Sequence, residues 1–519
     1  MALGRSVFTV GGLTFLSRLL GMVRDMVTAA YLGAGPIADA VFVAFRLPNL
    51  FRSLFAEGAF SIAFVPKFTD ILTRQGRDNA FLFAEQAMAL LFGAVMALVV
   101  LGEIMMPVIM RVVAPGFSDD TGQFASVIEF ARITFPYILL MSMVALQGGV
   151  MNSLGKFYAF AASPCIMNVV MIIAMVVITP LSQSAGHAFA FGVLASGIAQ
   201  WAWMAYAMHS DAVILRPKWP VLSDDMKTML RAIVPAALGS GALQVNILIG
   251  VMIGSFLPIG SISYLYYADR INQFPLGVVG IAIGTVLLPV LSKHISAGDA
   301  AEAARQQNRG LEMGLLLSVP ATIGLLVIPL PVIDVLFARG AFDYEAARQT
   351  AYALAAFALG LPAYVMMKAL SPGFFARGDT KTPVKIAFVC VAINTLLNLL
   401  LMGLMQHVGI ALGTSIASWI NAYLLAAALQ SKGFWQADAQ LKSRSLKILI
   451  ASLVMGAVVW LLQMELESWL LGHFAQKLLA LLTLVAAGVI VYGALVLILG
   501  AVSIAELRTL RKPKYSQSD

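Results

Sequence analysis

Charged side chains are scarce in this chain: only 12% of its 519 residues are Asp, Glu, Lys or Arg, whereas 60% are hydrophobic. The mean hydropathy is +0.88. Soluble domains carry about a quarter of their residues as charged side chains, so a soluble multidomain protein is excluded. The composition predicts an integral membrane protein.

Cysteine is nearly absent as well. The two cysteines, Cys165 and Cys390, each lie within an apolar run, which excludes a disulfide framework and a cysteine-ligated metal site. The five histidines lack the spacing of metal ligands. No P-loop, zinc-helix or nucleophile-elbow motif occurs, so we expect neither ATP-driven transport nor an enzyme active site. No cofactor and no metal are predicted.

Long apolar runs dominate what remains. Segments of about 20 apolar residues are long enough to cross a bilayer as helices, and about fourteen occur. We therefore predict an all-α polytopic membrane protein. The expected spans are 7–30, 36–64, 79–110, 124–151, 157–180, 187–208, 229–257, 261–290, 311–337, 346–370, 384–405, 409–430, 446–465 and 477–502.

The basic residues between these spans predict the topology. Cytoplasmic loops are enriched in Lys and Arg, and most of the basic residues fall on one side if the N- and C-termini are both cytoplasmic. The other side then receives only Arg111, Arg339, Arg348 and Lys477. The net charge of +8 reflects this loop bias, so nucleic acid is not an expected partner.

The first twelve spans form two similar halves. Pro107-Val108-Ile109 has a counterpart in Pro331-Val332-Ile333, and the same spacing relates Arg46 to Arg270. Each half has six spans, so both insert in the same direction, as in transporters with parallel repeats. The predicted parts are an N-lobe (1–222, spans one to six), a C-lobe (223–431, spans seven to twelve) and an addition (432–519, spans thirteen and fourteen with a basic tail).

Several basic residues lie inside the apolar spans. A charge at the bilayer centre costs at least ~2.5 kcal/mol, so it is kept where it faces a polar cavity and meets an anion. In the first span, Arg18, Arg24 and Asp25 share a polar face. The alternative to a binding role is an internal Arg18–Asp25 ion pair, whereas Arg24 has no obvious acid of its own. The intramembrane cations are Arg18, Arg24, Arg46, Arg52, Arg132, Arg270 and Lys368.

The second and eighth spans repeat this pattern. Asp39, Arg46 and Glu57 lie on one face of the second span with Arg52 beside them, and Pro48 is expected to kink or break the helix and expose polar backbone. A packing kink is the alternative. In the eighth span Ser263 and Arg270 share a face, with Asp269 beside it. Because several guanidinium groups suit a diphosphate better than one carboxylate, we predict a phosphorylated, amphiphilic ligand.

These segments contain motifs that closely resemble the MurJ (MviN) family of bacterial lipid II flippases, over essentially the whole chain. The motifs are SRLLGMVRD (17–25), DAVFVAFRLPN (39–49), FAEGAF (55–60), YYADR (266–270), FPLGV (274–278), GTVLLP (284–289) and DTKTPV (379–384).

The resemblance implies the fold of the multidrug/oligosaccharidyl-lipid/polysaccharide exporter superfamily, with two six-helix lobes and two extra helices that form a groove for a lipid tail. It implies a bacterial cytoplasmic membrane protein that moves the undecaprenyl-diphosphate-linked peptidoglycan precursor to the outer leaflet, with membrane lipids and the cell-wall synthesis machinery as partners. Arg24, Arg52 and Arg270 would bind the diphosphate. Arg18, Asp25, Asp39 and Glu57 would support these arginines. The resemblance assigns a substrate-binding role to Arg46 and Lys368 less strongly.

The resemblance also implies a sodium site, for which Asn394, Asn398 and Thr414 are candidates. Gly250 and Asn398 stand where carboxylates are expected, so coupling to the membrane potential is the alternative to sodium. Two other functions stay open: a flippase for another polyprenyl-linked glycan, and a cation-coupled multidrug antiporter, which would favour an acid-dominated cavity. A glycosyltransferase would need long external loops with acidic residues, and these loops are short.

Overall fold

The computed structural model describes residues 2–53, 59–216 and 218–502, and these residues form helices without a β-strand. The chain divides into two compact units. Unit 1 comprises Met1–Ser263 and Arg339–Ala346, and unit 2 comprises Tyr264–Ala338 and Ala347–Asp519. The predicted all-α membrane fold is confirmed, whereas the lobe boundaries 1–222, 223–431 and 432–519 remain predictions.

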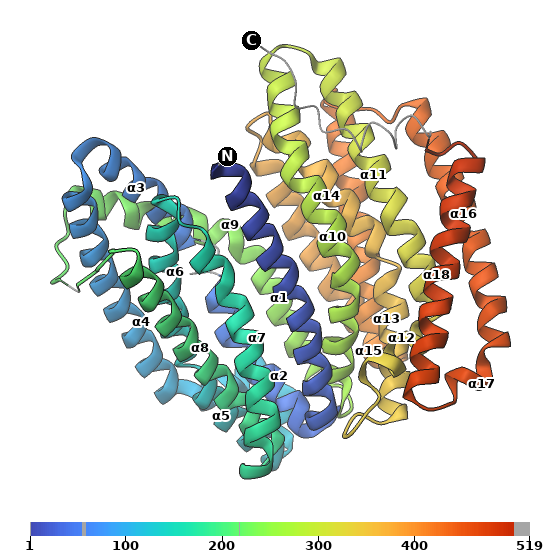
Figure 1. The fold of residues 1–519 in the computed structure, drawn as a ribbon, viewed down its shortest axis with the longest axis horizontal. Helices are drawn as coiled ribbons and strands as arrows, with labels where there is room; N and C mark the ends of the chain where they lie inside the picture. Colours follow the sequence, from blue (N-terminus) through green and yellow to red (C-terminus); the bar gives the residue numbers. More distant parts are fainter. Residues whose placement is uncertain (1, 54–58, 217, 503–519) are drawn as a thin grey trace. The chain divides into compact units, whose positions relative to one another are not determined.

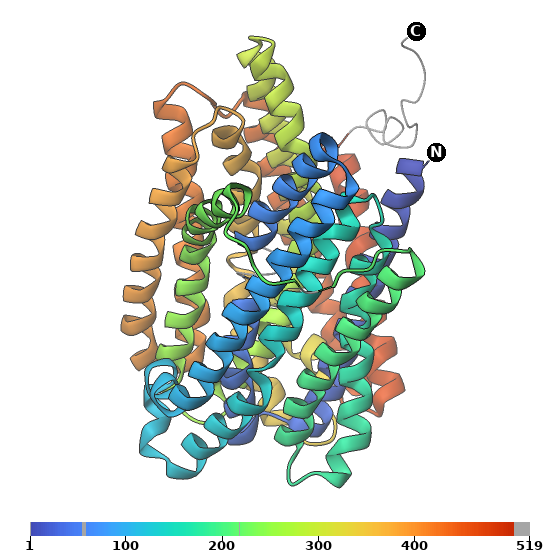
Figure 2. The same ribbon diagram turned by 90° about the vertical axis from the view of Figure 1, so that its left-hand side faces the viewer.

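Unit 1 is a bundle in which α7 packs along α1 and α8, and α2 packs against α5 (Figure 1). The helices α3 and α4 run side by side (Figure 2), and their contact is filled by stacked rings of Phe64, Phe68 and Phe83. Its elements are α1 (Ala2–Leu32), α2 (Pro36–Arg52), α3 (Ala59–Gln75), α4 (Arg77–Val113), η2 (Pro115–Asp119), α5 (Thr121–Thr134), α6 (Tyr137–Ser153), α7 (Tyr158–Ile178), η3 (Thr179–Leu181), α8 (Ala185–Ser210) and α9 (Asp224–Gly254).

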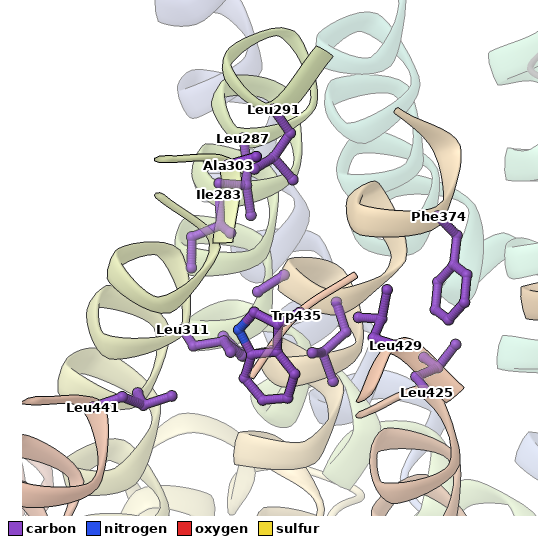
Figure 3. Packing of buried hydrophobic residues seen from close by; sticks show 13 residues of the cluster. Ile283, Leu287, Leu291, Ala303, Leu311, Phe374, Leu425, Leu429, Trp435 and Leu441 are labelled. Carbon is purple, nitrogen blue, oxygen red and sulfur yellow. The ribbon is translucent and has the colours of Figure 1, made fainter. Parts of the chain in front are cut away.

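Unit 2 surrounds an apolar core to which Leu311, Phe374 and Trp435 belong, with Leu311 beside Trp435 (Figure 3). The Trp435 indole donates a 2.7 Å hydrogen bond to Asn308 Oδ1, so this buried ring brings no unsatisfied donor into the core. Apart from the first three residues of α10 and of α13, which belong to unit 1, its elements are α10 (Ser261–Ser296), α11 (Ala300–Val327), α12 (Pro329–Phe337), α13 (Tyr344–Ala358), α14 (Leu361–Phe375), α15 (Lys381–Ser431), α16 (Ala439–Glu465), α17 (Glu467–Leu470) and α18 (Phe474–Ile498).

Polar side chains fix where several helices begin. Asp120 accepts hydrogen bonds from the first N–H groups of α5, Ser223 does so for α9 and Asp438 for α16. These caps satisfy donors that have no partner within the helix. The loop sequences therefore determine the ends of the apolar helices.

Nine helical segments among the described residues are long and apolar enough to cross a membrane. They cover ten of the fourteen predicted spans, because Lys381–Ser431 holds two of them. The segments α1, α2 and α10, which carry the intramembrane cations Arg24, Arg52 and Arg270, are not among the nine. Of these three, α2 has only 17 residues, one fewer than the 18 that the span criterion requires.

The helix α15 is a hairpin rather than one rod. Gln406 has φ 50° and ψ −130°, outside helical values, and it interrupts the helix between the predicted spans 384–405 and 409–430. Gly409 packs against the backbone of Leu401, and Gly413 packs against Asn398. The chain therefore reverses at Gln406, and small residues let its two halves approach closely.

A short segment far along the chain belongs to unit 1. The Ala341 N–H donates a 2.8 Å hydrogen bond to the Ala30 carbonyl at the end of α1. Gly33 and Gly340 have positive φ values of 67° and 59° and touch the opposing backbone, where a side chain would not fit. The segment Arg339–Ala346 thus lies at the end of α1 opposite the N-terminus.

Candidate functional site

Arg24 is held by Asp25 and Asn168 inside unit 1. Its guanidinium Nη2 lies 2.8 Å from Asp25 Oδ1, and Nη1 donates a 3.0 Å hydrogen bond to Asn168 Oδ1 on α7. Asn168 in turn donates to the Ser17 carbonyl at 2.9 Å, which fixes the orientation of its amide. Only 13% of the Arg24 side chain is exposed. The arginine is therefore ordered before any ligand arrives.

This geometry corrects one expectation. Asp25 was expected to pair with Arg18 if α1 were merely salt-bridged internally, and Arg24 was expected to have no acid on its own span. The structure pairs Asp25 with Arg24 instead. Arg18 and Asp25 are seven residues apart, a rise of about 10 Å, whereas the long Arg24 side chain folds back onto its neighbour. Arg18 itself is half-buried on α1.

Asn168 was missed by the sequence reasoning. A signal was available, because Asn168 is a lone amide within the very apolar span 157–180. Polar side chains at membrane depth face the protein interior and hydrogen-bond across helices. Its contact with Arg24 makes it part of the site.

Arg52 lies at the end of α2, next to a second interhelical contact. Its Nε donates a 3.1 Å hydrogen bond to Asn49 Oδ1, one turn earlier. Ser53 Oγ accepts a 3.0 Å hydrogen bond from Gln244 Nε2 on α9, a residue that the sequence reasoning also missed. Arg46 is half-buried on the same helix. The predicted site residue Glu57 falls outside the described residues.

Pro48 does not break this helix where a break was expected. The helix α2 continues through Pro48 to Arg52, and α3 begins at Ala59. The rings of Phe42 and Phe45 pack edge-on against Phe189 of α8, with centroids 6.1 and 5.7 Å away. Packing of the turns that precede the proline thus supports the helix despite the missing backbone donor.

Asp39 and Ser263 meet in the structure, and both are buried. The Asp39 carboxylate accepts hydrogen bonds from Gly260 N at 2.6 Å, Ser263 N at 2.8 Å and Ser263 Oγ at 2.6 Å. A carboxylate in this position caps the N-terminus of α10 and complements its dipole. Asp39 and Ser263 therefore stabilise the start of α10, and their predicted role in substrate binding remains a prediction.

In unit 2, Arg270 packs on an aromatic ring. Its guanidinium carbon lies 4.7 Å from the centroid of the Tyr266 ring, and Nη2 donates a 3.3 Å hydrogen bond to Tyr266 Oη. Asp269, beside it on α10, accepts a hydrogen bond from Gln273. Tyr266 was missed as a partner. Stacking on tyrosine orients a planar guanidinium group and its edge donors.

Lys368 lies on α14 with an exposed side chain. Its Cγ lies 3.6 Å from where a Cβ on Gly280 of α10 would be, so its stem packs where the two helices approach closely. A long lysine can bury this stem and keep its ammonium group hydrated.

The candidate cation-site residues lie in the α15 hairpin. Asn394 and Asn398 are buried, and with the Asn398 amide oriented so that its nitrogen faces them, Asn394 O, Asn394 Oδ1 and Ile410 O each lie 3.3 Å from that nitrogen. Thr414 Oγ1 donates to Ile410 O at 2.8 Å. These groups bind the two halves of the hairpin to each other. They fit a sodium ion poorly, because no carboxylate is among them.

Clusters of His, Cys, Asp and Glu that could hold a metal ion do not occur in the described part of the chain. The groups that could bind a ligand are therefore the ordered guanidinium groups of the arginines described above. Such groups bind phosphate or carboxylate oxygens.

Long apolar helices in two units, with arginines held inside them, define a polytopic membrane transporter. The chain belongs to the family described as lipid II flippase MurJ, whose model matches residues 28–493. It is 40% identical to the "Probable lipid II flippase MurJ" of Rhizobium meliloti (strain 1021), with 100% of this chain and 98% of that protein covered.

Two solved structures share the fold. The structure of "Lipid II flippase MurJ, inward closed conformation" has a TM-score of 0.79 at 26% identity, and the match covers 97% of this chain and 99% of that one. An inward-facing multidrug resistance MATE family transporter of the MOP superfamily has a TM-score of 0.69 at 13% identity, covering 82% of this chain and 98% of that one. The second likeness concerns the fold alone.

Proposed function

We propose that this protein is a lipid II flippase. It moves the undecaprenyl-diphosphate-linked peptidoglycan precursor from the inner to the outer leaflet of the bacterial cytoplasmic membrane, and both of its termini are cytoplasmic. The observation that carries the proposal is the full-length match to a probable lipid II flippase, with 100% of this chain and 98% of that protein covered. Transport is the whole function, without an enzymatic step.

The diphosphate is bound by Arg24, Arg52 and Arg270. The ordering of Arg24 by Asn168 and Asp25 supports this role, because a preoriented guanidinium group binds phosphate oxygens with a smaller loss of side-chain entropy. The stacking of Arg270 on Tyr266 orients its group in the same way. Substrate would enter from the cytoplasmic side and leave outward by alternating access.

The membrane potential drives the cycle in this proposal. The poor fit of Asn394, Asn398 and Thr414 to sodium supports the potential over a sodium gradient. Moving one elementary charge across 100 mV corresponds to about 2.3 kcal/mol, which is enough to bias a conformational equilibrium. Membrane lipids and the cell-wall synthesis machinery are the expected partners.

A flippase for another polyprenyl-linked glycan is the nearest alternative, because it would need the same arginines. A cation-coupled multidrug antiporter shares the fold, as the MATE transporter at 13% identity illustrates. Ordered arginines, rather than acids, favour an anionic substrate over a cationic drug.

The test is complementation. In cells depleted of their own flippase, this protein should restore growth and the accessibility of lipid II at the outer leaflet. Arg24→Ala should abolish both at normal expression, whereas Arg74→Ala, on the exposed end of α3, should not. Growth that returns with Arg24→Ala would remove Arg24 from the site, and failure of the unaltered protein would overturn the function.

A further inference from the structure

An open apolar groove of about 470 Å³ lies within unit 2, and its lining contains none of the predicted site residues. Leu326 of α11, Tyr352 and Ala355 of α13, and Met405 and Leu412 of α15 form its walls. Tyr352 and Met405 are 50% and 43% exposed, so the groove opens at the surface of the protein. The lining is almost wholly hydrocarbon, which suits an apolar chain.

Hydrogen bonds fix both ends of this groove. At one end, His407 at the tip of the α15 hairpin hydrogen-bonds through Nε2 to the Gln349 carbonyl at 3.0 Å. At the other end, Trp419 Nε1 donates a 2.8 Å hydrogen bond to the Leu359 carbonyl, where α13 stops. Two hydrogen bonds, one at each end of the groove, thus hold the α15 hairpin against α13. The groove is therefore part of the fold.

The face of α13 that lines the groove begins with a cation. Arg348, Tyr352, Ala355 and Leu359 fall within an arc of about 60° at 100° per residue. Arg348 is exposed and follows the segment Arg339–Ala346, which lies at the end of α1 opposite the N-terminus. With the predicted topology, this basic residue stands at the headgroup level of the outer leaflet, on the side where Lys and Arg are rare.

The length of this face matches one leaflet. From Arg348 to Leu359 the helix rises about 16 Å. Half of a bilayer's hydrocarbon core is about 15 Å thick. A molecule with its phosphate at Arg348 and one tail along Tyr352 and Ala355 would therefore end near the bilayer centre at Leu359.

We propose that this groove, which we call the α13 groove, binds a glycerophospholipid of the outer leaflet. One acyl chain occupies the groove and the phosphate accepts hydrogen bonds from Arg348. Glu345 lies one turn before Arg348, and an exposed carboxylate holds a guanidinium group only weakly, so a phosphate can compete for Arg348. A phospholipid fits better than a polyprenyl diphosphate, because a single guanidinium group marks this face and the isoprenoid is longer than one leaflet is deep.

Native mass spectrometry of the purified full-length protein tests the proposal, with phosphatidylglycerol as the probe. Ala355→Trp fills the groove and should remove one tightly bound lipid, whereas Ala97→Trp on the exposed face of α4 should not. Arg348→Ala should lower the affinity for that lipid about tenfold, because a charge-assisted contact is lost. Arg348→Lys, which keeps the charge, should lower the affinity less. Arg111→Ala, at the exposed end of α4, is the matched control.

Two further arms identify the occupant. Diacylglycerol has no phosphate, so its binding should be reduced by Ala355→Trp but unchanged by Arg348→Ala. Undecaprenyl phosphate should not displace the bound phosphatidylglycerol. Equal lipid binding by Ala355→Trp and Ala97→Trp would overturn the proposal, and so would displacement by undecaprenyl phosphate that Ala355→Trp abolishes. None of these outcomes depends on the transport assay.

Discussion

Gly409 lies against the backbone of Leu401, so closely that a methyl group on Gly409 would overlap the Leu401 carbonyl oxygen. This contact closes the α15 hairpin just after the turn at Gln406. It joins two spans that are consecutive in sequence. Substitutions that add a single methyl group at a glycine of this hairpin test its geometry.

Gly409→Ala should destabilise the protein by about 1–3 kcal/mol, because the added methyl group forces the two halves of the hairpin apart. Gly403→Ala is the matched control, since nothing lies within 4 Å of the position its methyl group would take. Thermal unfolding in detergent measures both. A Gly409→Ala variant as stable as Gly403→Ala would contradict the hairpin geometry.

Asn168→Ala should reduce transport roughly tenfold, because Arg24 loses a hydrogen bond of about 1.5–3 kcal/mol that orients its guanidinium group. Expression and folding should stay near normal. Outer-leaflet accessibility of lipid II in depleted cells is the measurement, and Asn79→Ala, on the exposed start of α4, is the control. Unchanged transport with Asn168→Ala would show that Arg24 does not need this partner.

Asp39→Ala should destabilise the protein by at least about 2 kcal/mol, since it leaves the buried Gly260 and Ser263 donors without their acceptor. Ser263→Ala removes one hydroxyl group and should cost about 1 kcal/mol. Chemical unfolding of the purified variants compares the two. If Ser263→Ala cost more than Asp39→Ala, the capping role of the carboxylate would be wrong.

Asp379, in the loop before α15, gives a pH-dependent test. Hydrogen bonds from Lys432 and Thr382 hold the pKa of Asp379 well below its ordinary value of 3.8. A lowered pKa means that the stabilisation is present above pH 3.8 and is lost as the pH falls below it. The difference in unfolding temperature between wild type and Asp379→Asn should therefore be constant from about pH 8 to about pH 5.

The same difference should shrink below about pH 4. Asp78→Asn, at the exposed start of α4, serves as a control for adding a neutral amide. A difference between wild type and Asp379→Asn that already shrank near neutral pH would contradict the lowered pKa.

Much of the fold follows from the sequence, because hydropathy alone finds helices that must satisfy their own backbone in lipid. The gap between the predicted spans 384–405 and 409–430 contains Gln406, where the helix is in fact interrupted. A break at Pro48 was wrong, because a local rule for proline does not include the packing of Phe42 and Phe45 on α8, whereas a kink there stays a prediction. Tertiary contacts decided that case.

The site was predictable in its residue types but not in its pairings. The cationic residues stand out in apolar helices, whereas the partner of Arg24 depends on how α1 and α7 pack, which sequence spacing on one helix cannot give. The same reason hid Gln244 beside Ser53. Asp39 and Ser263 were placed in the site for their polarity, and only the folded chain reveals that they contact each other.

The Asn168 amide has one further consequence for Arg24. A flexible arginine would have to give up its rotational freedom each time a phosphate arrived and would regain it at each departure. Because α7 has already immobilised this side chain, that penalty is met once, during folding. In the proposed transport cycle, each passing headgroup would then meet a binding group of constant shape, which it could occupy and leave with little rearrangement of the protein around it.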